Sequence, residues 1–275
     1  MRKVLSVVAI AAFAGLAQAQ DMSQVNGYSA EIRRFNDFGG SSLLVNGVNE
    51  PAPTTHPLAY GPVHFQENFA QGEPGNFANK HIAWLSADGG ANKARTNVGQ
   101  SWSIDFDVNM NSASGAPRKE AGIEIWQPRG SYASPDFIDE GQVLIASDNG
   151  EVAVFGASLP FTGFGTGCYT LGTTAHVSFR YFAPGVQDPT KGAYQLVFTD
   201  AVTGVHDSGI KVWGAEYDNV SGMRGAYVGL KDQNQRNPFI ADSVDVLYSG
   251  VSIVPAPAAL GLLGLAGLSA ARRRR

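Results

Sequence analysis

In this chain of 275 residues, the arrangement that most nearly resembles a catalytic site is made of acidic side chains. Glu216 and Asp218 stand close together in the stretch Glu216-Tyr-Asp-Asn-Val-Ser221, and Glu124 lies in an apolar stretch farther upstream. Two carboxyl groups about 5–5.5 Å apart can cleave a glycosidic bond, one as the nucleophile and the other as the acid and base. The first stretch lies between glycines in a predicted loop, and Glu124 has no acidic partner in register. We interpret these side chains as solvated surface carboxylates and expect no enzymatic activity.

Other catalytic patterns are missing from the sequence. It contains no Gly-x-Ser-x-Gly elbow, no His-Glu-x-x-His and no glycine-rich phosphate loop before a helix. The five histidines are scattered without ligand spacing, which predicts surface or half-buried side chains: His56, His64, His81, His176 and His206. We therefore expect no cofactor, with calcium as an alternative.

The calcium alternative rests on oxygen-bearing side chains. Asp105 and Asp107 share one face of a predicted strand, and loop oxygens gather at Asp136–Glu140, Asp148–Asn149 and Asp232–Asn234. Carboxylate and amide oxygens are the ligands that calcium uses. None of these stretches forms an EF-hand or a repeat-type calcium loop, so the sequence assigns no metal ligands.

A candidate glycan-binding patch begins where a predicted strand ends at Trp126. Trp126 and Gln127, with Arg129 and Tyr132 in the following loop, combine aromatic rings with hydrogen-bonding groups, as a sugar-binding platform requires. The alternative is that Trp126 packs at the edge of the domain. The other tryptophans lie inside strand patterns and are predicted core residues: Trp84, Trp102 and Trp213.

The elements that must position these residues are strands. In Ser101–Met110 every even residue is apolar and every odd one polar, which is typical of a half-buried strand. Similar patterns predict strands at 122–126, 142–146, 151–155, 176–181, 193–198, 210–213, 225–230 and 243–248. Between residues 60 and 253 no apolar stripe recurs at helical spacing.

Turn signals separate these strands. Asn149-Gly150 between two apolar runs predicts a β-hairpin, because both residues tolerate positive φ, and Thr199–Gly204 predicts a second turn. Many short strands and 33 glycines favour an all-β antiparallel sandwich. A closed barrel is the alternative.

The N-terminus has the layout of a secretory signal peptide. A basic start precedes the apolar run Val4–Leu16, and Ala17 and Ala19 stand at the −3 and −1 positions of cleavage before Gln20. We therefore expect an exported protein. Cys168 is the only cysteine, so no intramolecular disulfide can form, and we expect it to be buried.

The body of the chain is acidic. Without the basic residues of the two ends (Arg2, Lys3 and Arg272–Arg275), 14 basic residues remain against 24 acidic ones, a net charge of −10. An acidic surface repels phosphate backbones, so we expect no nucleic-acid partner.

The C-terminal tail joins Pro255-Ala256-Pro257 to an apolar run and an arginine cluster, Arg272, Arg273, Arg274 and Arg275. The run Ala258–Ala271 would span about 21 Å as a helix, less than the ~30 Å hydrocarbon core of a bilayer, while the arginines favour the cytoplasmic side. This order resembles the PEP-CTERM sorting signal, although Ala256 stands where that family usually has glutamate.

That resemblance implies a Gram-negative bacterium that makes extracellular polysaccharide. It implies transient anchoring of the C-terminal helix in the inner membrane, processing by a membrane enzyme called exosortase, and delivery to the cell surface or extracellular matrix.

The body resembles the concanavalin A-like lectin/glucanase jelly roll in its strand spacing, over roughly residues 60–254. The residues that carry the likeness are His81–Gly90, Ala121–Trp126, Val244–Tyr248 and Val251–Ile253. A glucanase of this kind would carry Glu-x-Asp-x-(x)-Glu on one strand, and the Glu216 stretch has no second glutamate.

These observations predict four segments. They are a signal peptide with its helix (1–19), a loop-rich N-terminal segment (20–59), a β-sandwich (60–254) and a sorting signal with a short membrane helix (255–275). The predicted function is a non-catalytic cell-surface or matrix protein. The alternatives are a lectin-like domain for extracellular polysaccharide and a glycoside hydrolase whose site the sequence does not reveal.

Overall fold

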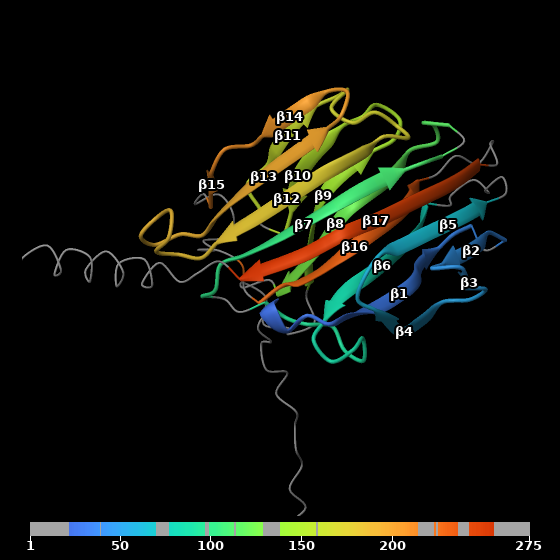
Figure 1. Cartoon of the computed structure of the whole chain (residues 1–275), viewed down its shortest axis with the longest axis horizontal. Coiled ribbons are helices and arrows are strands. Elements are labelled where there is room, and N and C mark those ends of the chain that lie inside the picture. Colours follow the sequence, from blue (N-terminus) through green and yellow to red (C-terminus); the bar gives the residue numbers. More distant parts are fainter. Residues whose placement is uncertain are drawn as a thin grey trace, which may run out of the picture.

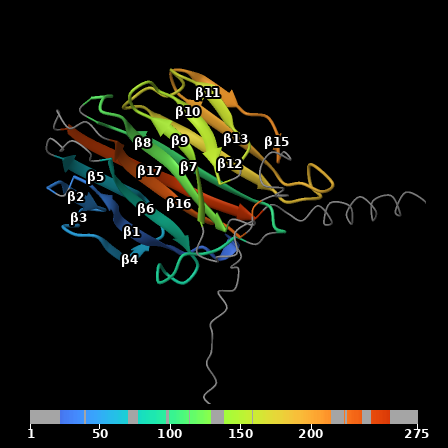
Figure 2. The same cartoon turned by 180° about the vertical axis from the view of Figure 1, so that it is seen from behind.

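The computed structural model describes residues 22–38, 40–69, 77–96, 99–112, 114–128, 138–157, 159–213, 223, 225–235 and 242–255. Apart from a 3-10 turn at Met22–Gln24, the regular structure of these residues is β-strand. The strands form two antiparallel sheets that face each other, as Figures 1 and 2 show from opposite sides. The predicted all-β antiparallel sandwich is confirmed.

Sheet A has eight strands. In spatial order they are β11 (Thr162–Gly165), β10 (Val152–Gly156), β9 (Ile138–Ala146), β8 (Lys119–Pro128), β16 (Tyr227–Gln235), β6 (Ala78–Ser86), β1 (Gly27–Asn36) and β4 (Thr54–Ala59).

Sheet B has nine strands, one of them off the main path. The path runs β14 (Gly204–Asp207), β13 (Ala193–Asp200), β12 (Thr174–Phe182), β7 (Trp102–Met110), β17 (Asp242–Pro255), β5 (Val63–Phe69), β2 (Ser42–Val45) and β3 (Val48–Asn49), while β15 (Lys211–Val212) pairs with β13. Across the described residues each sheet keeps its own two edge strands, so the strands do not close into a barrel. The chain passes between the sheets from β5 through β8, an alternation typical of jelly rolls.

The core lies between the sheets and follows the period-two pattern of the sequence. Along β7 the even residues are buried and the odd ones half-buried, as predicted. Trp102 and Trp213 belong to this core and Cys168 is buried, as predicted. Trp84 is also buried, but it packs with Ile82 and Trp126 in a separate cluster. The Asn149-Gly150 hairpin joins β9 to β10, with Gly150 at φ +65°.

The segment 20–59, expected to be loop-rich with at most a short strand at 43–45, supplies β1 to β4, so this prediction is wrong for all but β2. The strand β1 lies inside sheet A between β4 and β6. Its alternation is hidden because both faces are mostly covered and the register shifts between Glu31 and Phe35, where buried Arg33 has φ +53°. Among the residues described here, the sandwich therefore begins at Gly27.

The predicted signal helix and C-terminal membrane helix lie outside the described residues. Within the described part, no helix is long and apolar enough to cross a membrane.

Candidate functional site

A groove of about 620 Å³ crosses the outer face of sheet A. It lies over β6, β16, β8 and β9, and alternation sends every second residue of these strands into it while the residues between them face the core. The lining residues are Phe35, Phe77, Lys80, Arg118, Glu120, Glu124, Glu140, Gly141, Gln142, Leu144, Phe155, Gln233 and Gln235.

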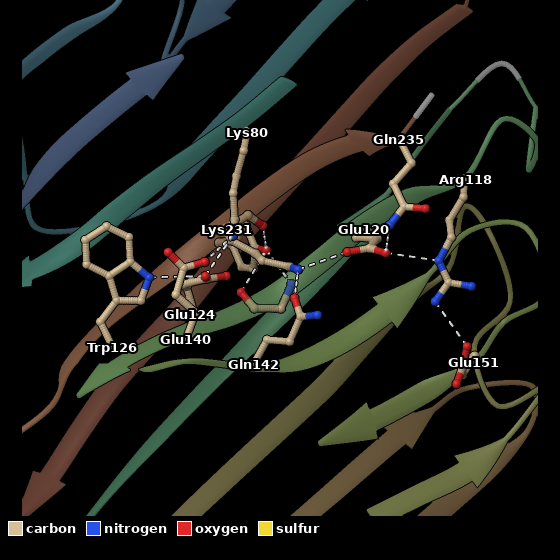
Figure 3. A network of polar contacts seen from close by, with 12 residues as sticks. Lys80, Arg118, Glu120, Glu124, Trp126, Glu140, Gln142, Glu151, Lys231 and Gln235 are labelled. Carbon is tan, nitrogen blue, oxygen red and sulfur yellow. Dashed lines mark hydrogen bonds and ion pairs between the residues drawn. The ribbon is translucent and has the colours of Figure 1, made fainter. Parts of the chain in front are cut away.

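Glu120 is the centre of a polar network in this groove (Figure 3). Its carboxylate accepts hydrogen bonds from Lys231 at 3.0 Å, from Arg118 at 3.0 Å and from Gln235 at 2.5 Å. Lys231 also donates to the amide oxygen of Gln142, and Arg118 donates a further hydrogen bond to Glu151 at 3.1 Å. Burial opposes ionisation of Glu120, but Lys231 and Arg118 outweigh it and hold the pKa of this carboxyl below its usual range.

A glycine on β8 allows β9 to approach closely at this network. Lys231 lies directly opposite Gly122, which has φ +124°. A Cβ at Gly122 would lie 2.0 Å from the backbone oxygen of Val143, so the approach of β9 requires glycine here. With β8 and β9 this close, Lys231 reaches a partner on each of them, Glu120 and Gln142.

Two further carboxylates meet at Lys80. Its ammonium lies 2.7 Å from an oxygen of Glu124 and 3.9 Å from one of Glu140. Because both distances end on the same nitrogen, the two oxygens can be no farther apart than their sum, 6.6 Å. Glu140 also forms a 2.8 Å ion pair with Arg34.

The sequence interpretation of Glu124 was therefore wrong in two respects. Its side chain is buried, not solvated, because Lys80 and the indole N–H of Trp126 cover it. It also has an acidic neighbour: Glu140 lies opposite Trp126, one diagonal step from Glu124 on the same face. The second oxygen of Glu124 is buried without a hydrogen-bond partner.

The predicted glycan platform at Trp126 is not exposed. Trp126 and Gln127 are 4% and 2% exposed, while Arg129 and Tyr132 lie outside the described residues. The guanidinium of Arg34 lies 3.7 Å from the centre of the Trp126 ring, and the ring of Trp84 packs against it at 4.5 Å. These contacts agree with the alternative interpretation of the sequence, in which Trp126 packs against the domain instead of binding a glycan.

The exposed aromatic surface of the groove comes instead from phenylalanines. Phe77 is 58% exposed and packs edge-on against half-buried Phe35, with ring centres 6.3 Å apart. Half-buried Phe155 lines another part of the groove. Aromatic rings beside amides are the surface that a sugar ring can contact.

A second polar cluster is buried between the sheets. It is centred on Glu67 of β5, which accepts hydrogen bonds from Ser41, Asn79, His81 and Asn234. Burial opposes ionisation of Glu67, but the bonds from His81, Ser41 and Asn79 hold its pKa below the usual value. Asp232, directly opposite His81 on β16, has no partner, and burial together with the charge of Glu67 raises its pKa well above the usual range.

The structure corrects the prediction for His81, which is 0% exposed rather than on the surface. It lies with Glu67 and Asp232 in the group of described residues whose ligand atoms fall within 4.8 Å of one another. His64 and His176 pair with Asp245 and Asp107, as surface histidines do.

The remaining predicted residues lie outside the Glu67 cluster, and one of them, Asp148, pairs with a member of the groove network. Asp105 and Asp107 lie on the outer face of sheet B, and Asp148 forms a 3.3 Å ion pair with Arg118. Several predicted residues lie outside the described part: Glu216, Asp218, Asp136, Ala17, Ala19, Gln20, Ala256, Pro257 and Arg272–Arg275. Pro255 ends β17.

Sequence reasoning missed Lys80, Glu120, Gln142, Lys231 and Gln235. It named Glu140 and Gln233 only among loop oxygens for calcium, whereas the structure places them on the strands β9 and β16. The signal that could have found them is register: once β8 pairs with β9 and β16, Glu120, Gln142 and Lys231 fall on one face.

No family model matches the chain, and no curated protein matches it. Solved structures similar to it include alginate lyase A1-II′, a member of polysaccharide lyase family 7, at 10% identity and a TM-score of 0.47 over 86% of this chain and 99% of that one. A PL-14 alginate lyase from Aplysia kurodai has 10% identity and a TM-score of 0.44 over 70% and 83% of the two chains. A seed lectin of Lotus tetragonolobus has 12% identity and a TM-score of 0.36 over 84% and 100%. These likenesses are too weak to carry an argument about function. The assignment of the fold as a sandwich comes from the strand pairing described above.

Proposed function

We propose that this is an exported cell-surface or matrix protein whose groove on sheet A binds extracellular polysaccharide without cleaving it. The observation that carries the proposal is the lining of the groove. Amide groups of Gln142, Gln233 and Gln235 lie in one open groove with the exposed ring of Phe77. Oriented hydrogen-bonding groups beside an apolar surface are what a sugar, with its hydroxyls and C–H faces, requires.

Binding is favoured over hydrolysis because the acids of the groove are already engaged. Glu120 accepts hydrogen bonds from two cations and one amide. Glu124 accepts hydrogen bonds from Lys80 and from the Trp126 indole. Glu140 forms an ion pair with Arg34. A glycosidase needs one carboxyl to attack or activate water and another to deliver a proton. The ion pairs here hold the acids to the protein rather than presenting them to a substrate.

A glycoside hydrolase is the second candidate, and one observation favours it. Glu124 and Glu140 approach the same lysine, and the upper limit of 6.6 Å between the two oxygens that face it leaves room for the 5–5.5 Å carboxyl separation of retaining enzymes. For a lyase, which must take a proton from carbon, the described lining offers neither histidine nor tyrosine as the base.

The test is turnover against binding on the same polysaccharides. We expect the purified protein to be retained by some of laminarin, lichenan and the native matrix in affinity electrophoresis while releasing no reducing sugar from any of them. Reducing-sugar release that Glu124→Gln and Glu140→Gln both abolish would establish the hydrolase instead. Retention by none of the polysaccharides would reject carbohydrate binding.

The export part of the proposal rests on the resemblance of the tail to the PEP-CTERM signal. We expect the surface-extracted protein to start at Gln20 and to lack Arg272–Arg275, because exosortase would cut near Pro255–Pro257. Intact-mass measurement tests this, and recovery of the complete C-terminus would contradict it.

A further inference from the structure

The cluster between the sheets holds oxygen atoms that have nothing to bind. Both carboxylate oxygens of Asp232 and the amide oxygen of Asn234 are buried without a hydrogen-bond partner. Both side chains are 0% exposed. Burying a carboxylate with no donor is strongly unfavourable, so a group that compensates these oxygens is expected. The groove function makes no use of them.

The spacing of the cluster suits a cation. One ligand atom from each of Glu67, His81 and Asp232 lies within 4.8 Å of the other two. Two oxygens that share a calcium ion at about 2.3–2.6 Å can be no more than about 5 Å apart. The carboxylates of Glu67 and Asp232 are therefore close enough to bind one ion together.

Hydrogen bonding excludes His81 as a ligand of that ion. Its Nδ1 accepts the backbone N–H of Arg33 at 2.9 Å, so the ring proton of the neutral tautomer is on Nε2. This Nε2–H points to Glu67 Oε2 at 3.3 Å and donates to it. His81 thus orients the carboxylate of Glu67 and leaves the ligand set to oxygen atoms.

The orientation of Asn234 follows from the same reasoning. Its Nδ2 donates to Glu67, because a carboxylate can only accept, and this leaves Oδ1 as an acceptor without a donor. Two carboxylates and an amide oxygen form a ligand set typical of a hard cation, whereas zinc prefers nitrogen and sulfur ligands.

We propose that Asp232, Asn234 and Glu67 bind one calcium ion between the two sheets. A pocket of about 310 Å³ meets the cluster at Glu67, which lines it together with Gln66 and Asp245. The ion would link β16 of sheet A to β5 of sheet B, so its effect is on stability and is independent of the groove.

The test compares the protein stripped with EDTA with the same protein in millimolar calcium. We expect one calcium per chain by equilibrium dialysis and a rise in Tm of about 5 °C or more. Asp232→Asn keeps the shape of the side chain but should abolish both effects. The matched control, Asp105→Asn on the outer face of sheet B, should retain both.

Three results would overturn the proposal. One is the absence of bound calcium and of any Tm rise in the wild type. Another is a response to zinc but not to calcium, which would make His81 a ligand. The third is an Asp232→Asn protein that is more stable than the wild type with or without calcium, which would mean that Asp232 carries a proton rather than a metal. If Asp232→Asn does not fold, dialysis of the wild type against calcium, magnesium and zinc decides.

Discussion

Strands β7 and β16 occupy the centres of the two sheets, but they differ in the polarity of the side chains that they place on their two faces. In β7, apolar residues from Trp102 to Met110 face the core and polar ones face outward. In the second half of β16, both faces are polar: Lys231, Gln233 and Gln235 face the groove, while Asp232 and Asn234 face the interior. Four of these five residues are nonetheless fully or almost fully buried.

This difference separates the part of the molecule that stabilises the fold from the part that is available for binding. Around β7, burial of apolar surface holds the sheets together without requiring a particular partner. Around β16, each buried polar group depends on named partners, and the loss of one leaves another uncompensated. The groove and the inter-sheet cluster both lie along this second strand, on its two faces.

The largest effect is expected from a charge placed in the apolar region. Phe106→Asp or Ile104→Asp should abolish the cooperative unfolding transition, because either change buries an unpaired carboxylate at a cost of several kcal/mol. Thermal and urea denaturation followed by circular dichroism would measure it. Asp105→Ser, between the two on the outer face, should change stability by less than about 0.5 kcal/mol. Equal behaviour of all three variants would mean that the faces of β7 are misassigned.

A smaller but still large effect is expected in the polar region. Lys231→Met should lower the free energy of unfolding by about 3–5 kcal/mol, since it leaves Glu120 buried without its main cation. Urea denaturation measures the change. Lys191→Met in the loop before β13 is the matched control and should be nearly neutral. A loss below 1 kcal/mol for Lys231→Met would show that the network contributes little.

A dependence on pH should also mark the polar region. The folded pKa of Glu120 is below its unfolded value of 4.5, so its contribution to stability is fully present above that pH and is lost as the pH falls through the folded pKa. We expect the urea midpoint of the wild type to fall between pH 6 and pH 3, and Glu120→Gln to show a smaller fall. An identical fall in the two proteins would contradict the role given to this carboxylate.

The same contrast explains what the sequence can predict. Alternation of apolar and polar residues located β7, β12 and β13, and Asn149-Gly150 located a hairpin, because these patterns depend only on local burial and turn geometry. The sequence pattern ended β16 at Leu230, because an alternation between two sets of polar residues has no hydrophobic period. Glu140 could not be paired with Glu124 without the register of β8 and β9. Burial of Trp126 depends on Arg34, from a segment predicted to be loop.

The central claim is that polysaccharide binds in the groove on sheet A, and one pair of variants tests it most directly. Phe77 and Phe161 are similarly exposed, at 58% and 65%, but only Phe77 is among the residues that line the groove. In affinity electrophoresis on the best-retained polysaccharide, Phe77→Ala should weaken binding about tenfold, since stacking on one ring contributes about 1–1.5 kcal/mol, and Phe161→Ala should bind like the wild type. Loss of binding in Phe161→Ala with full binding in Phe77→Ala would place the site elsewhere and contradict the account.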